Sequence, residues 1–158
     1  MTQKLDANRV SLLWASLEHA AEIAACHSAL FPEPWDTASF ERLLENPGST
    51  SFVARHGNPQ QTLGFVVGVL AADDAEILTL GVSKPYQRNG VARRLIDALA
   101  RAARNAEAKR LFLDVADDNI PALVLYSRLG FKEAGRRKAY YQRTDGPAID
   151  ALTLQLTL

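Results

Sequence analysis

Apolar residues recur along the chain with two different periods, and the change of period separates helical from extended segments. In residues 16–29 they return every three or four positions, which predicts an amphipathic helix ending before Pro32. A second helix is predicted after Asp36, because a carboxylate suits the N-cap position, and it closes at Asn46-Pro47-Gly48.

The middle of the chain has short apolar runs typical of strands. Residues 51–55 and 62–70 are separated by Gly57-Asn58-Pro59, which predicts a hairpin, and residues 75–82 form a further strand. A helix follows over 90–106, because its apolar residues form one stripe.

The remaining segments alternate between the two types. Residues 110–115 are predicted as a strand, Asn119 caps a helix to Leu129, and 131–135 and 150–157 are strands. The resulting order, ααβββαβαββ, predicts a mixed α+β (α/β) fold in which helices cover both faces of one sheet. We expect a single domain over residues 1–158.

Composition narrows the class of protein. Hydrophobic residues make up 47 % of the chain, but no apolar run is long enough to span a bilayer, so no membrane role is expected. The first ten residues lack a signal-peptide core, and one cysteine, Cys26, suits a reducing cytoplasm. The net charge of zero favours no nucleic-acid partner, and no ligand spacing predicts a metal site.

Charge is nevertheless unevenly distributed. Residues 84–110 carry only two acidic side chains, Asp97 and Glu107, against eight basic ones, namely Lys84, Arg88, Arg93, Arg94, Arg101, Arg104, Lys109 and Arg110. A cationic segment in a neutral protein indicates either a solvated helix face or a bound anion.

The loop before the third helix favours the anion. A strand ends near Val82, a polar loop follows, and the helix starts at Gly90. The first turn of a helix has unpaired N–H groups and a positive dipole end, which together attract phosphate. Gly90 leaves room for the ligand, and Arg88 and Arg93 add charge.

Known glycine-rich phosphate motifs do not match this loop. A dinucleotide-binding GxGxxG lacks two of its glycines here, and the Gly-Lys-Ser/Thr of a P-loop is missing. What remains is Gln87-Arg88-Asn89-Gly90-Val91-Ala92, which resembles the acetyl-CoA signature R/Q-x-x-G-x-G/A of the GNAT superfamily of N-acetyltransferases.

The resemblance covers nearly the whole chain from Trp14 onward, including Glu76–Val82 and the NIPALVLYSRLGF stretch at 119–131. It implies acetyl-CoA as co-substrate and a mostly antiparallel twisted sheet that splays between its fourth and fifth strands, with a bulge tolerated at Gly81. The implied cofactor contacts are Leu80, Gly81, Val82, Arg88, Asn89, Gly90, Val91, Ala92, Arg93 and Asn119.

Two further stretches, Phe31-Pro-Glu-Pro-Trp-Asp and Arg136-Arg-Lys-Ala-Tyr-Tyr, resemble the RimI type within that superfamily, the ribosomal-protein-alanine N-acetyltransferases. This resemblance implies transfer of acetyl to a protein N-terminus, such as an alanine of a small-subunit ribosomal protein. It also implies a cytoplasmic monomer or weak dimer. Tyr140 and Tyr141 become candidates for the acceptor site, whereas Trp35 could line that site or pack the first two helices.

The resemblance also supplies candidate catalytic residues. Tyr126 matches the general acid that protonates the departing sulfur, although its helical spacing also suits a core tyrosine. Two carboxylates compete as general base: Asp114 stands where RimI-type enzymes have a glutamate, and Glu76 matches the catalytic glutamate of other members. Either could instead be a solvent-facing carboxylate at a strand end.

The acceptor is constrained by acid–base chemistry. At pH 7 an α-amine with a pKa of about 8 is roughly one-tenth neutral, whereas a lysine is almost wholly charged, so an α-amine needs a weaker base. A short aspartate therefore favours an α-amine. Two alternatives stay open, namely an enzyme for small-molecule amines and a non-catalytic acyl-CoA sensor.

Overall fold

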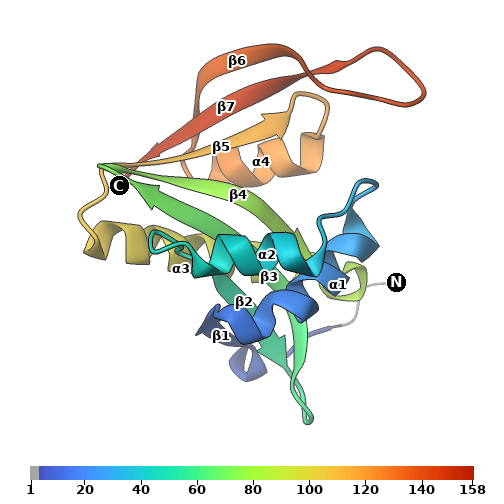
Figure 1. Cartoon of the computed structure of the whole chain (residues 1–158), viewed down its shortest axis with the longest axis vertical. Helices are drawn as coiled ribbons and strands as arrows, with labels where there is room; N and C mark the ends of the chain where they lie inside the picture. Colours follow the sequence, from blue (N-terminus) through green and yellow to red (C-terminus); the bar gives the residue numbers. More distant parts are fainter. Residues whose placement is uncertain (1–3) are drawn as a thin grey trace.

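The computed structural model describes residues 4–158, so residues 1–3 of the predicted domain lie outside the described part. Seven strands form one sheet in the order β1-β2-β3-β4-β5-β7-β6 (Figure 1). The strands are β1 (Ser11–Trp14), β2 (Phe52–His56), β3 (Gln61–Ala71), β4 (Asp74–Val82), β5 (Arg110–Ala116), β6 (Lys132–Tyr141) and β7 (Ile149–Thr157). Among the named pairs only β4 and β5 run parallel.

Four α-helices cover the two faces of this sheet: α1 (Ala20–Leu30), α2 (Thr37–Glu45), α3 (Val91–Asn105) and α4 (Ile120–Arg128). Helices α1 and α2 lie in front of the sheet in Figure 1 and α3 and α4 behind it. Single turns of 3₁₀ helix occur at Ala7–Arg9, Leu17–His19 and Lys84–Tyr86. The predicted mixed α+β architecture is confirmed.

Local sequence signals place the helix starts. The Asp36 side chain accepts a hydrogen bond from Ser39 N at 2.8 Å, and Asn119 accepts one from Ala122 N at 3.3 Å. Both residues are the N-caps that the sequence predicts. These caps fix where α2 and α4 begin, and thereby the direction of the chain on either side of the sheet.

Two segments differ from the sequence prediction. The sequence pattern does not predict β1, an edge strand of four residues that is mostly exposed and therefore lacks apolar alternation. The strand predicted over 131–135 is longer in the structure, where β6 continues to Tyr141. The polar run 136–138 hid this extension, because all three side chains are exposed.

Two separate cores lie on the two faces of the sheet. Leu95, Leu99 and Leu111 belong to the larger core, beneath α3 and α4, and all three are fully buried. Ile23, Phe40 and Phe65 belong to the smaller core, beneath α1 and α2. The sheet is thus held from both sides, and its middle strands are fixed in position for the site described next.

Candidate active site

In the interior of the sheet, β4 and β5 separate along part of their length, and the space between them is here called the β4–β5 gap. The two strands pair only at their first residues, Asp74–Glu76 with Arg110–Phe112, and then separate. Figure 1 shows them diverging from the edge where both begin. This is the splay that the resemblance implied. Backbone groups beyond Glu76 therefore have no strand partner on this side.

An extra residue in β4 accompanies the separation. Val67 of β3 pairs with Thr79 and Gly68 with Ile77, which leaves Leu78 as a bulge. The sequence prediction put a bulge at Gly81, which is wrong, because Gly81 pairs regularly with Phe65. A Cβ on Gly81 would lie 2.8 Å from Leu30 Cδ1, so close packing against α1 is what requires glycine there.

Beyond the bulge, alternate peptide groups of β4 face the gap. Ser83 N donates to Leu63 O at 2.8 Å, and in an antiparallel pair hydrogen-bonded and non-hydrogen-bonded positions alternate. Gly81 therefore bonds to β3, whereas the peptide groups of Leu80 and Val82 point into the β4–β5 gap. The Val82 carbonyl already accepts from Gln87 Nε2 at 2.9 Å, which ties the following loop to the strand.

The loop and first turn formed by residues 87–92, here called the phosphate cradle, precede α3. Arg88 and Gly90 both have left-handed backbones, with φ of 61° and 76°. Gly90 is the N-cap without any side-chain cap, and a Cβ there would meet nothing within 4 Å. Within the described residues no acceptor pairs with the first N–H groups of α3, so they face free space. Such a space fits a phosphate group.

Side chains of the cradle divide into two kinds. Arg88 is exposed, and Arg93 is exposed with Asp97 as its ion-pair partner at 3.9 Å, so both can turn toward an anion. Asn89 instead closes the loop, donating to Gln87 O at 2.9 Å and accepting from Leu5 N. Val91 is buried and Ala92 packs against the larger core, which leaves only their N–H groups for a ligand.

Tyr126 lies on α4 and is 8 % exposed. Its ring packs edge-on against Phe131 with centroids 5.6 Å apart. Burial, with a smaller effect of Tyr141, raises the pKa of Tyr126 to about 12, so the hydroxyl carries its proton at neutral pH. Within the described part of the chain this hydroxyl has no hydrogen-bond partner.

The two candidate bases line one pocket of about 320 Å³ at the closed end of the β4–β5 gap. Asp114 is held there on two sides: Thr153 Oγ1 donates to its Oδ1 at 2.6 Å, and Arg137 Nε lies 3.6 Å from its Oδ2. Glu76 is exposed and has no ion pair with the described residues. The structure thus brings both carboxylates together and holds only Asp114 in place.

Tyr140 and Tyr141 end β6 on the same side of the molecule. Their rings form a T-shaped pair with centroids 5.2 Å apart, and the Arg137 guanidinium lies 5.2 Å from the Tyr140 ring. Burial, together with the charge of Asp114, raises the pKa of Tyr141. Arg137 connects this pair of tyrosines with Asp114, because its Nε lies 3.6 Å from Asp114 Oδ2 while its guanidinium lies over the Tyr140 ring.

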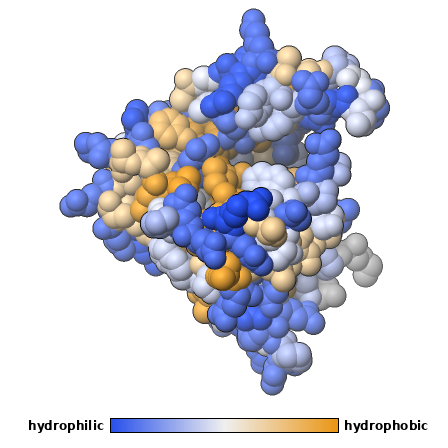
Figure 2. Space-filling model, viewed as in Figure 1, coloured by the Kyte–Doolittle hydropathy of each residue, from blue (hydrophilic) through white to orange (hydrophobic). Residues whose placement is uncertain are grey.

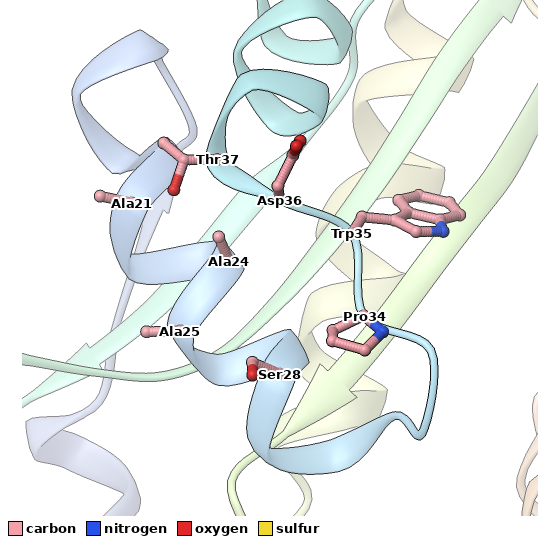
Figure 3. Close-up of a pocket in the computed structure, with 8 residues that line it drawn as sticks. All are labelled: Ala21, Ala24, Ala25, Ser28, Pro34, Trp35, Asp36 and Thr37. Carbon is pink, nitrogen blue, oxygen red and sulfur yellow. The ribbon is translucent and has the colours of Figure 1, made fainter.

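Trp35 belongs to the connection between α1 and α2. Its ring stacks on His27 with centroids 5.2 Å apart and still remains 39 % exposed, so it both packs and offers a surface. Figure 3 shows the indole pointing away from the alanines of α1 and over the sheet. His27 accepts a hydrogen bond from Trp35 N at 3.2 Å and so supports the connection that carries Trp35.

The face that carries these groups is hollowed. In Figure 2, apolar side chains gather between the β6–β7 hairpin and α2, beside the hollow. Sequence reasoning missed Arg137 and Thr153, which hold Asp114 from β6 and β7. Their signal is purely spatial, because the register Asp114↔Thr153 joins residues far apart in the chain.

Among residues 4–158, no helix is long and apolar enough to cross a membrane. The same residues contain no group of three potential metal-binding side chains.

The sequence of this chain is similar to those of known proteins. The model of the acetyltransferase (GNAT) family matches residues 15–131. The N-alpha-acetyltransferase RimI of Mycobacterium tuberculosis is 34 % identical, over 92 % of this chain and 89 % of that protein. The [ribosomal protein bS18]-alanine N-acetyltransferase of Escherichia coli K12 is 30 % identical, over 79 % and 82 %.

Solved structures show the same fold. The crystal structure of the ribosomal-protein-S18-alanine N-acetyltransferase from Escherichia coli superposes with a TM-score of 0.86, covering 94 % of this chain and 93 % of that one at 24 % identity. Ard1 from Thermoplasma volcanium gives a TM-score of 0.84, covering 95 % and 98 % at 22 % identity.

Proposed function

Because this chain belongs to the GNAT family of acetyltransferases, we propose that it transfers the acetyl group of acetyl-CoA to the α-amine of a protein N-terminus. The acceptor that its relatives' names favour is the N-terminal alanine of ribosomal protein bS18. One structural observation supports the proposal: Asp114, held by Thr153 and Arg137, lines the pocket at the point where β4 and β5 separate.

The phosphate cradle suits the pyrophosphate of acetyl-CoA. The N–H groups of Val91 and Ala92 and the guanidinium groups of Arg88 and Arg93 supply donors and charge. From there a pantetheine arm fits along the β4–β5 gap, where the peptide groups of Leu80 and Val82 offer hydrogen bonds. Asn119, already the N-cap of α4, lies at the start of the helix that carries Tyr126.

Acetyl transfer forms a bond between the amine nitrogen and the thioester carbonyl carbon, and it breaks the carbon–sulfur bond. Negative charge develops on the carbonyl oxygen, and a β4 N–H that faces the gap, such as that of Leu80, stabilises it. Tyr126 donates its hydrogen to the departing sulfur. Since its pKa is about 12, the hydroxyl is protonated at every pH at which the enzyme would act.

Asp114 is the better placed of the two bases. The parallel register Glu76↔Phe112 puts Asp114 two residues further along the gap than Glu76, nearer to the level of Leu80. At about 3.3 Å per residue this is a difference of roughly 7 Å. Thr153 and Arg137 hold the Asp114 side chain in place, and it takes the proton of the amine directly or through a water.

The acceptor enters between the α1–α2 connection and the β6–β7 hairpin. Trp35 stands on one wall, and Tyr140 and Tyr141 stand on the other. We place the reaction in the cytoplasm, where ribosomal proteins are made, and we propose that the enzyme works as a monomer or weak dimer. The exposed rings of Trp35 and Tyr140 suit an extended chain better than a small enclosed amine.

The test is release of free thiol from acetyl-CoA with a short peptide beginning with alanine, comparing wild type with Tyr126→Phe. We expect the variant to lower kcat by about 10²–10⁴-fold while the peptide KM changes little, because the lost group acts on the leaving sulfur. The pKa of about 12 also predicts that Tyr126 adds no alkaline limb to the wild-type profile below that pH.

The same assay separates the competing functions. Polyamines and aminoglycosides replace the peptide in a parallel series, and calorimetry with acetyl-CoA reports binding. Faster turnover with those amines would reassign the acceptor to small molecules. Binding without turnover on any amine would indicate an acyl-CoA sensor and would contradict the proposal.

A further inference from the structure

The β6–β7 hairpin contains an irregularity just before the two tyrosines. Between the pairs Arg137↔Ala151 and Tyr141↔Ile149, residues 138–140 of β6 lie opposite a single residue of β7, Asp150. At the centre of this bulge Ala139 has a φ of 49°, a left-handed backbone in which its Cβ crowds the neighbouring carbonyl. Something must hold an alanine in that conformation.

The Asp150 carboxylate provides the restraint. Its Oδ1 accepts a hydrogen bond from Ala139 N at 2.8 Å, while its Oδ2 accepts one from Arg136 Nη1 at 2.9 Å. The pKa of Asp150 is lowered first by the bond from Ala139 and then by that from Arg136. Asp150 is therefore a carboxylate that binds the strained backbone and an arginine of the same strand at once.

The restraint also reaches the cofactor side of the site. Arg136 Nη1 donates to Asp117 Oδ2 at 2.9 Å, and Asp117 N donates to Asp150 O at 3.0 Å. Asp117 lies in the β5–α4 loop, two residues before Asn119, the N-cap of the helix that carries Tyr126. One carboxylate thus connects the bulge in β6 with the start of α4.

The bulge decides where the tyrosines lie. The two extra residues of β6 shift its pairing with β7 by two positions and bend the strand. Tyr140 and Tyr141 follow Ala139 directly, and Tyr141 is close enough to Tyr126 to affect its pKa. If Ala139 relaxed to an ordinary extended backbone, both rings would leave their present positions.

We propose that Asp150 is a positioning residue for acceptor binding: it holds the left-handed backbone of Ala139 and thereby places Tyr140 and Tyr141 at the acceptor site. The inference rests on the proposed function for its kinetic consequence only. The placement of the rings is a property of the fold and can be measured without any substrate.

The kinetic experiment compares Asp150→Ala with the double variant Asp150→Ala/Ala139→Gly. We expect Asp150→Ala to raise the KM for the alanine peptide about tenfold, the scale of one lost charge-assisted hydrogen bond, with the KM for acetyl-CoA unchanged within about twofold. Glycine adopts the left-handed backbone without strain, so the double variant should recover to within about threefold of wild type.

Two further variants sharpen the comparison. Asp150→Asn keeps an oxygen for Ala139 N, so its peptide KM should lie between those of wild type and Asp150→Ala. Asp145→Ala removes an exposed aspartate from the same hairpin that makes no ion pair with the described residues, and it should leave both KM values unchanged. An equal effect of Asp145→Ala, or no rescue by glycine, would overturn the inference.

A structural readout is independent of turnover. The ring-proton NMR shifts of Tyr140 and Tyr141 report their T-shaped contact. They should move toward free-tyrosine values in Asp150→Ala and return in the double variant; unchanged shifts would contradict the placement. If wild type does not acetylate the peptide, the proposed function fails, and these shifts still decide the role of Asp150.

Discussion

At the scale of single residues, the surroundings of each titratable group decide what it can do. Burial raises the pKa of Tyr126, whereas Thr153 donates a hydrogen bond to Asp114 and Arg137 pairs with it. A phenol and a carboxylate in such different surroundings suit the different roles of acid and base that we propose for them.

The choice of base is open to a pH-resolved comparison. We expect Asp114→Asn to lower kcat/KM for the alanine peptide at pH 7 by about 10²-fold, and Glu76→Gln by less than about fivefold. The loss in Asp114→Asn should shrink at pH 9, because an α-amine with a pKa of about 8 is then mostly neutral and needs no base. Initial rates over pH 6.5–9.5 provide the measurement.

Arg137→Gln is the matched control, since it removes the ion pair of Asp114 and retains the carboxylate. It should raise the peptide KM without the pH-dependent recovery. A larger loss in Glu76→Gln than in Asp114→Asn would transfer the role of base to Glu76.

Residue roles were predictable from sequence only where the partner is local. Asp36 and Asn119 each accept a hydrogen bond from a backbone N–H three residues further along, and both N-caps were predicted correctly. Asp150 and Thr153 could not be assigned in this way, because their partners lie 11 and 39 residues away along the chain. Only the register of the sheet brings these groups together.

At the scale of elements, the strand–loop–helix unit from β4 to α3 is the part of the site that we propose binds the cofactor. Its loop depends on Gly90, whose φ of 76° is strained for any residue with a Cβ. The helix was predictable because its apolar stripe is long and regular. The site of the β4 bulge was not, because a bulge depends on how β3 pairs with β4, and no local residue marks it.

Gly90→Ala tests this unit. The left-handed backbone costs an alanine about 1–2 kcal/mol, so we expect the loop to relax and the KM for acetyl-CoA to rise about tenfold, with the peptide KM unchanged. Titration calorimetry with CoA measures the change in affinity directly, as a dissociation constant.

Gly146→Ala is the control, because Gly146 also has open space around its Cβ position but no left-handed φ. Equal behaviour of the two variants would show that the backbone of Gly90 is not needed for binding.

At the scale of the whole molecule, two cores of different character share one sheet. The smaller core contains an aromatic cluster around His27, which stacks on Phe31 at 4.1 Å and contacts Trp35, Phe40 and Phe65. Burial lowers the pKa of His27, so the ring is neutral in the folded protein. Trp35, which we propose lines the acceptor site, therefore packs on a neutral histidine.

Stability should consequently depend on pH. The unfolded chain, whose histidine has a pKa of about 6.5, binds a proton that buried His27 rejects. Acid therefore favours unfolding, and Tm should fall as the pH drops below about 6.5. His27→Asn should be less stable at pH 7.5 yet show a flatter profile, as scanning calorimetry from pH 5 to 7.5 would reveal.

His56 on β2 is the control, since it lies outside the aromatic cluster. His56→Gln should keep the wild-type slope. An unchanged slope in His27→Asn would assign the acid sensitivity to other groups.

The separation of β4 from β5 has a consequence for how the sheet is completed. Strands inside a sheet normally satisfy their neighbours, and an unsatisfied edge is a template for any passing chain. Here that edge lies between two strands of one sheet, β4 and β5. Acetyl-CoA would then serve as a surrogate strand, adding itself between β4 and β5 by β-augmentation. The hydrogen bonding of this strand edge would then be complete only when the donor is bound.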